Sequence, residues 1–157
     1  TNMSIGESFP VFGNWFYIAF IENEGMAFGM SFGGVVGKYI LSAFRIVLSA
    51  ALVWGISDLV KKGKTPMSVL IALSLIPTGA IGNVLDCMFY GVIWDYAPLM
   101  QGRVVDMLYF PLIDTYVGGR HITFFDPVFN IADSCVTIGA FWLVIDYLIH
   151  PESRNSL

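Results

Sequence analysis

Three long apolar runs dominate the sequence, and each is close to the length of a membrane-spanning helix. They extend over about residues 38–60, 67–90 and 129–149. A hydrocarbon core about 30 Å thick requires about 20 apolar residues in a helix. The pattern therefore predicts an α-helical integral membrane protein, with three spans in a single membrane domain of residues 1–157.

The segments outside these runs have a different pattern. The stretch 9–21, FPVFGNWFYIAFI, is rich in aromatic residues and is interrupted by one proline and one glycine, which favours strands over a helix. Trp15 and Phe16 suit a membrane interface. We expect residues 1–36 to form a small β-rich extracytoplasmic platform. The irregular, aromatic connection 91–128 is expected to extend this platform.

The distribution of lysines predicts the orientation of the spans. Lys61, Lys62 and Lys64 lie between the first and second spans, and no other short loop has such a cluster. Because positively charged loops stay on the cytoplasmic side, this loop should be cytoplasmic. Thr1 and the connection then lie outside the cytoplasm. A multi-span chain that begins outside needs an upstream signal, so we expect a further transmembrane helix before Thr1.

Composition agrees with a membrane protein and narrows its chemistry. The chain is 56% hydrophobic and 13% charged, whereas a soluble domain is roughly 25% charged. Its net charge of −4 argues against a nucleic-acid partner. Cys87 and Cys135 lie in apolar runs, and we interpret both as small buried residues. His121 and His150 are the two histidines and form no H-E-x-x-H motif, so the sequence indicates neither a metalloprotease nor any cofactor.

Polar residues near the outward ends of the spans form a repeated pattern. Asn83 and Asp86 in the second span are three residues apart, as are Asn130 and Asp133 in the third, so each pair shares a helix face. An Asp at the centre of a span costs about 2.5–3.5 kcal/mol, and such residues mark function or a buried pairing. The platform can also place Asp106 on the outward end of the third span.

Such a set of carboxylates can perform acid–base chemistry. Two carboxyl groups held close together share one proton. The ionised group can accept a proton from water, while the protonated group donates to the oxygen of a scissile carbonyl. Asn side chains can donate hydrogen bonds to the carboxylates or to a substrate backbone.

Spacing alone leaves other interpretations open. The Asn/Asp pairs can simply tie helices together, or can line a proton or cation path, as in a transporter. A transporter should have repeated halves and a site at the bilayer midplane, whereas these carboxylates are expected near one boundary. Spacing also permits Asp86 and Asp106 to exchange roles.

Four segments resemble motifs of lipoprotein signal peptidases, the signal peptidase II family, and occur in the family's order. Glu22–Gly29 resembles N-x-G-x-A-F-G, and Gly79–Asp86 resembles G-x-x-G-N-x-x-D. Val104–Asp106 resembles V-V-D, and Phe129–Ser134 resembles F-N-x-A-D-S. Together they reach from residue 22 to residue 134.

This resemblance implies a bacterial intramembrane aspartic peptidase with a four-helix architecture, whose first span is missing from this sequence. Such enzymes lie in the cytoplasmic (inner) membrane, with the active site near the extracytoplasmic face. They remove the signal peptide of a diacylglyceryl-modified prolipoprotein just before the lipid-modified cysteine. Globomycin-type peptides inhibit them. We expect membrane lipid as a further partner, no nucleic acid, no cofactor and a monomeric enzyme.

The resemblance also assigns roles to individual residues. The catalytic pair carries over as Asp106 and Asp133. The substrate-binding and supporting residues carry over as Asn23, Gly25, Asn83, Asp86 and Asn130.

The sequence departs from the family pattern in two further ways. The family has Arg after the aspartate of G-N-x-x-D, but this chain has Cys87. Arg103 and Arg120 are candidates to replace that charge beside Asp86. In addition, the stretches on either side of Asp106 look long for the family, and we interpret them as insertions that enlarge the platform.

Overall fold

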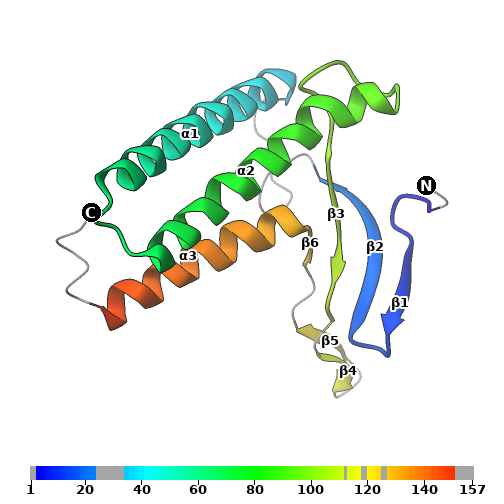
Figure 1. Cartoon of the computed structure of the whole chain (residues 1–157). Helices are drawn as coiled ribbons and strands as arrows, with labels where there is room; N and C mark the ends of the chain where they lie inside the picture. The colour runs from blue at the N-terminus through cyan, green and yellow to red at the C-terminus, as the bar shows by residue number, and fades with distance from the viewer. Residues whose placement is uncertain (1–2, 24–33, 112, 118–119, 125–126, 151–157) are drawn as a thin grey trace.

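A computed structural model describes residues 3–23, 34–111, 113–117, 120–124 and 127–150. Three helices dominate it: α1 (Gly34–Lys62), α2 (Met67–Ile93) and α3 (Ile131–Ile149). Within the described residues, all three are long and apolar enough to cross a membrane. α2 packs against both α1 and α3 (Figure 1). The three predicted spans are therefore confirmed as helices.

The helix ends differ from the prediction for local reasons. α1 begins at Gly34, before the predicted start at residue 38, so Lys38 lies within the helix, where its ammonium group donates to the carbonyl oxygen of Gln101 (2.9 Å). α2 continues to Ile93 rather than ending at residue 90. α3 begins at Ile131, two residues later than predicted, because Asn130 has an extended backbone and caps the helix.

Strands form the platform at one end of the helices, as predicted. A four-stranded antiparallel sheet has the order β1-β2-β3-β6, and a separate hairpin pairs β4 with β5. Because β3 and β6 come from the connection between α2 and α3, that connection extends the N-terminal platform, as expected. The strands are β1 (Ser8–Phe12), β2 (Phe16–Asn23), β3 (Val104–Tyr109), β4 (Ile113–Val117), β5 (Arg120–Phe124) and β6 (Val128–Phe129).

Glycines allow α2 and α3 to approach closely. A Cβ atom on Gly79 of α2 would collide with the carbonyl oxygen of Ala132 in α3. A Cβ atom on Gly139 of α3 would lie 2.7 Å from the carbonyl oxygen of Ala72 in α2. Small residues at such positions let membrane helices pack backbone to backbone. This packing fixes the polar residues of the two helices against each other at the ends nearest the sheet.

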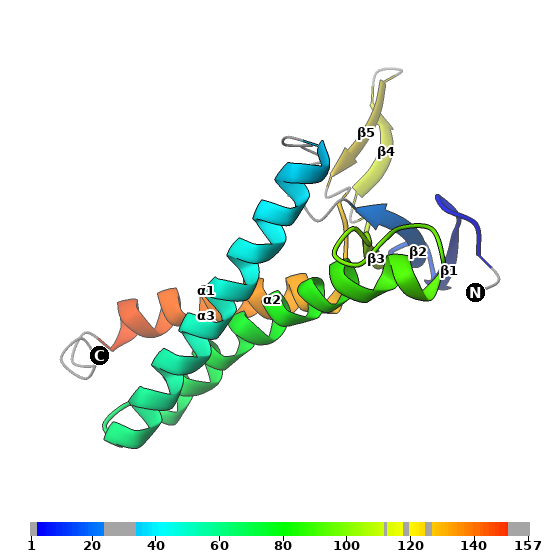
Figure 2. The same ribbon diagram turned by 90° about the horizontal axis from the view of Figure 1, so that it is seen from above.

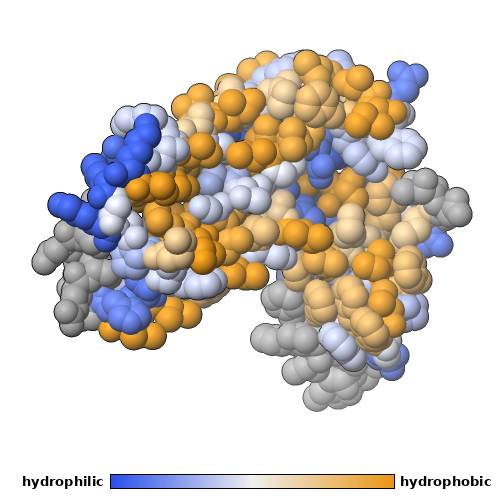
Figure 3. All heavy atoms as spheres, viewed as in Figure 1, coloured by the Kyte–Doolittle hydropathy of each residue, from blue (hydrophilic) through white to orange (hydrophobic). Residues whose placement is uncertain are grey.

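The outer surfaces of the helices are apolar. Large hydrophobic side chains along α1, α2 and α3 are exposed, and hydrophobic atoms cover much of the helical region in Figure 3. A soluble protein rarely exposes so much contiguous apolar surface. The fold is that of a multi-pass membrane protein. Figures 1 and 2 place the sheet at one end of the helices and the α1–α2 loop, with its lysines, at the other.

Candidate active site

Asp106 lies at the centre of a buried polar network. It belongs to β3, which the antiparallel register places beside β2, and only 3% of it is exposed. Its Oδ2 atom accepts a hydrogen bond from Nδ2 of Asn23 in β2 (3.0 Å). Its Oδ1 atom accepts one from Nδ2 of Asn130 (2.8 Å), the residue that precedes α3. The sheet therefore brings Asp106 onto the N-terminal end of α3, as the sequence predicted.

Asn130 connects this aspartate to the helices. Its Nδ2 group donates to Oδ1 of Asn83 in α2 (3.1 Å) as well as to Asp106. Its Oδ1 atom accepts a hydrogen bond from the backbone N–H of Asp133 (2.9 Å), which caps α3. One side chain thus both begins the helix and bridges two polar partners.

Asp133 completes the network from the first turn of α3. Its Oδ1 atom accepts a hydrogen bond from Nδ2 of Asn83 (2.8 Å). Its Oδ2 atom lies 3.5 Å from the backbone N–H of Asn130, the reciprocal contact of a capping box. Asp106 and Asp133 are therefore joined through the carboxamides of Asn130 and Asn83. With Asn23, the structure brings together five of the residues proposed from the sequence.

Burial perturbs the ionisation of Asp106. Desolvation of the charged form is the largest effect and raises the pKa of this carboxyl group above its usual value. The hydrogen bonds from Asn23 and Asn130 act in the opposite direction, because they favour the ionised form. The negative charge of Asp133, and more weakly that of Asp86, raises the pKa further. Asp133 is thus close enough to affect the protonation of Asp106.

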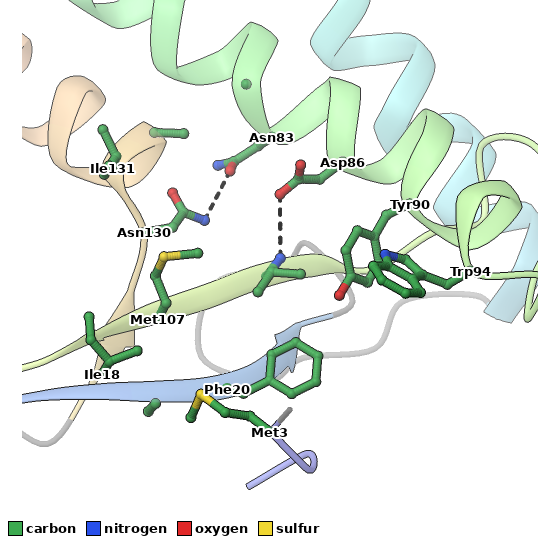
Figure 4. Close-up of a pocket in the computed structure, with 14 residues that line it drawn as sticks. Met3, Ile18, Phe20, Asn83, Asp86, Tyr90, Trp94, Met107, Asn130 and Ile131 are labelled. Carbon is green, nitrogen blue, oxygen red and sulfur yellow. Dashed lines mark hydrogen bonds between the residues drawn. The ribbon is translucent and has the colours of Figure 1, made fainter. Parts of the chain in front are cut away.

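Asp86 has a different place in the site. It lies on α2, one turn beyond Asn83, and its Oδ2 atom accepts a hydrogen bond from the backbone N–H of Val105 (3.4 Å), which Figure 4 shows. This contact joins β3 to α2 next to Asp106. The geometry therefore makes Asp106, rather than Asp86, the carboxylate that shares the amide network with Asp133.

Cys87, which stands where the family motif has Arg, is buried. Arg45 of α1 is a positively charged residue near its side chain. Arg103, a candidate partner for Asp86, instead forms an ion pair with Glu22 (3.0 Å). The side chain of Arg120 and all of Gly25 lie outside the described residues, so neither assignment is tested.

A cavity of about 540 Å³ lies between the sheet and the outer ends of α2 and α3 (Figure 4). Its walls are mostly apolar, and Asn83, Asp86 and Asn130 reach it. Asp106 and Asp133 are not among the described residues that line the cavity. The side chains that hydrogen-bond to them, Asn83 and Asn130, do line it.

Sequence reasoning missed the aromatic wall of this cavity. Tyr90 in α2 and Trp94, which caps the end of α2, follow Asp86 at intervals of four residues, and both line the cavity. Residues four apart share a helix face, so the spacing from Asp86 is the sequence signal by which both residues could have been found. Within the described part of the chain, no group of three or more His, Cys, Asp or Glu residues is arranged to hold a metal ion.

A family model described as signal peptidase (SPase) II matches residues 1–149. The chain belongs to the signal peptidase II family.

Individual relatives cover most of the chain. A lipoprotein signal peptidase of Porphyromonas gingivalis is 41% identical over 169 residues, which cover 94% of this chain and 73% of the relative. A lipoprotein signal peptidase of Amoebophilus asiaticus is 34% identical over 160 residues, covering 92% of this chain and 67% of the relative. The chain is therefore a peptidase-family member related to enzymes of lipoprotein processing.

Two solved structures of bacterial membrane enzymes have a similar fold. A bacterial membrane enzyme solved at 2.3 Å resolution superposes with a TM-score of 0.64 at 31% identity, covering 96% of this chain and 76% of that chain. A second, solved at 1.9 Å resolution, gives a TM-score of 0.62 at 30% identity, covering 94% of this chain and 79% of that chain.

Proposed function

We propose that this protein is an aspartic endopeptidase that removes the signal peptide of prolipoproteins just before a diacylglyceryl-modified cysteine. Membership of the signal peptidase II family supports the substrate class. The observation that carries the catalytic type is the pair Asp106 and Asp133, which Asn130 and Asn83 hold in one hydrogen-bonded network.

The proposed mechanism uses the two carboxyl groups as a unit. One proton is shared between Asp106 and Asp133, and the pKa of Asp106, raised by burial, favours its retention. The ionised carboxylate accepts a proton from a water molecule, whose oxygen attacks the scissile carbonyl carbon. The protonated carboxyl group donates its proton to the carbonyl oxygen, which forms a tetrahedral intermediate without a covalent bond to the enzyme. Collapse of the intermediate expels the amine, which takes up the proton that the dyad accepted from water. A hydroxyl group of the intermediate returns its proton to the other carboxylate, which restores the shared proton.

In this proposal, three asparagines orient the two catalytic carboxyl groups through hydrogen bonds. Asn23 and Asn130 donate to the two oxygens of Asp106 and fix the plane of its carboxyl group. Asn83 performs the same task for Asp133. A rigid arrangement of this kind holds the reacting groups in place before substrate arrives.

Asp86 and Gly25 complete the proposed site. Asp86 holds the strand that carries Asp106 by accepting from the backbone of Val105. Gly25, which lies outside the described residues, is proposed next to the substrate on the basis of its motif.

The location of the pair suits a substrate anchored by acyl chains. Asp133 lies in the first turn of α3, at the end of the span, so the pair lies near one boundary of the bilayer. We infer that this boundary is the extracytoplasmic face of the cytoplasmic membrane, because the lysines of the α1–α2 loop lie at the opposite end. We propose a monomer that globomycin-type peptides inhibit by occupying the same site.

Cleavage by the dyad variants tests this function. Asp106→Asn and Asp133→Asn each remove the shared proton while keeping the size of the side chain. We expect cleavage of a lipid-modified prolipoprotein to fall by at least about 100-fold in each variant, the lower range for loss of acid–base catalysis. Cleavage by the unmodified protein should stop when globomycin is added.

Asp58→Asn is a matched control. Asp58 is half-exposed and forms an i,i+4 ion pair with Lys62 (2.7 Å) at the lysine-rich end, far from the dyad, so this variant should cleave at the normal rate. Normal cleavage by either dyad variant would remove that aspartate from the mechanism.

A further inference from the structure

The β1–β2 hairpin exposes an uncharged, aromatic surface that the proposed chemistry does not use. Residues 8–21 contain no Asp, Glu, Lys or Arg. Phe12 is 59% exposed and Trp15 is 55% exposed, and Phe9 and Val11 are also exposed. In Figure 3, hydrophobic atoms gather over this hairpin. An exposed patch of aromatic side chains without charged residues among them marks a surface that contacts another protein, a ligand or a membrane.

These rings continue into the strands that hold the candidate active site. The rings of Phe12 and Phe16 stack with centroids 6.1 Å apart. Phe16 stacks on Phe110 at 4.6 Å, and Phe110 stacks on Phe129 at 5.8 Å. Trp15 also stacks on Phe110, at 6.2 Å. The five residues form an aromatic ladder from the hairpin turn to the residue before Asn130.

The position of the hairpin relative to the helices indicates what covers it. Figure 1 shows that the strands run from the outer end of α2 back past the start of α3. The β1–β2 turn therefore lies no farther out along the helices than the first turn of α3. Because α3 has 19 residues and is about 28 Å long, its first turn lies at the boundary of the hydrocarbon core if the helix spans the bilayer. The hairpin turn is then level with that boundary.

We propose that the β1–β2 hairpin inserts its aromatic turn into the interfacial region of the lipid bilayer, on the same side as the active site. Lipid is the partner that fits, because the turn is level with the boundary of the hydrocarbon core and its exposed side chains are aromatic or aliphatic. Aromatic side chains, and Trp above all, concentrate at this depth of a membrane. The absence of charged side chains from residues 8–21 suits lipid better than a polar protein surface.

This contact sets the height of the active site relative to the bilayer. Phe110 follows β3, the strand that holds Asp106, and Phe129 directly precedes Asn130. The ladder joins both to the inserted turn. The hairpin is thus a second membrane contact beside the helices, and it positions the sheet-borne aspartate at the depth of α3.

Depth-dependent quenching of Trp15 tests the inserted position. A variant with Trp15 as its only tryptophan, made by Trp54→Phe, Trp94→Phe and Trp142→Phe, is placed in nanodiscs of lipids brominated at different depths of the acyl chain. We expect the largest loss of Trp15 emission with bromines nearest the headgroup, and little loss with aqueous iodide. A matched variant that keeps only Trp54, which is 75% exposed within α1, should lose more emission with deeper bromines.

Two outcomes would overturn the inference. Quenching of Trp15 by iodide but by none of the brominated lipids would place the hairpin in water. Protection of Trp15 from both quenchers would mean that protein covers it, in a second copy or another partner. The measurement requires no cleavage, so its result is separable from the fate of the proposed peptidase function.

Discussion

Asn130 performs two tasks that substitution can separate. Its side-chain oxygen caps α3, and its side-chain nitrogen joins Asp106 to Asn83. The cap is a local contact within the first turn, whereas the bridge connects three elements of the fold. Stability and activity should therefore depend differently on this residue.

We expect Asn130→Ser to lose activity with little loss of stability. Serine is a good N-cap, but its shorter side chain has no amide to donate to Asp106. Asn130→Ala removes both contacts and should lower the free energy of unfolding by a further ~1 kcal/mol, the usual cost of losing a cap. Thermal unfolding in detergent and prolipoprotein cleavage measure the two effects. Equal activity of Asn130→Ser and the unmodified protein would exclude the bridge from function.

The raised pKa of Asp106 predicts how activity depends on pH. Burial makes the native protein retain this proton at a pH where the unfolded chain has lost it. The bound proton therefore stabilises the native state fully at a pH below the pKa that Asp106 has in the unfolded chain. This stabilisation is lost as the pH rises from that pKa through the higher pKa of Asp106 in the native protein. Cleavage that needs the shared proton should fall on the alkaline side of the same transition.

Asn23→Ala tests this assignment. Asn23 favours the ionised form of Asp106 through its hydrogen bond, so its loss raises the pKa of that carboxyl group. The alkaline limb of the pH–rate profile should then move to higher pH. Asn14→Ala, in the exposed β1–β2 turn, should leave the limb in place. A limb that moves to lower pH with Asn23→Ala would contradict the assigned cause of the pKa.

At the scale of elements, the contact between α2 and α3 determines the geometry of the site. Gly79→Ala should lower the free energy of unfolding by ~1–3 kcal/mol, the typical cost of overpacking, because its Cβ would meet the carbonyl oxygen of Ala132. The same displacement would separate Asn83 from Asp133 and reduce cleavage. Gly55→Ala is the matched control, because nothing lies within 4 Å of the added Cβ atom.

The elements differ in how far the sequence could predict them. The spans were predictable because lipid imposes a length and an apolar composition on each helix. Their ends were less predictable, since Lys38 and Asn130 find partners that hydropathy does not reveal. Asp106 could be placed beside α3 in general terms, but its contact with Asn23 depends on the register of β2 with β3, which involves residues far apart in sequence. The Arg45–Cys87 contact between helices carries no periodic signal at all.

At the scale of the whole molecule, charge and chemistry lie at opposite ends of the helices. Lys61 and Lys62 end α1, and Lys64 follows in the loop to α2, while Asp106 and the sheet lie at the other end (Figure 1). The positive-inside rule predicts that the lysines lie in the cytoplasm. An active site at the far end can then reach a lipid-modified cysteine only after the substrate has crossed the membrane.

Single-cysteine labelling tests this orientation in intact bacterial cells. With Cys87 and Cys135 changed to Ala, Glu7→Cys places a thiol on an exposed position beside β1, and Lys64→Cys places one in the exposed α1–α2 loop. A membrane-impermeant maleimide should label the first variant in intact cells, and the second only after the cells are opened. The reverse pattern would place Asp106 and Asp133 on the cytoplasmic side, where a secreted substrate cannot meet them after export. The orientation, and not only the dyad, must therefore hold for the proposed function to stand.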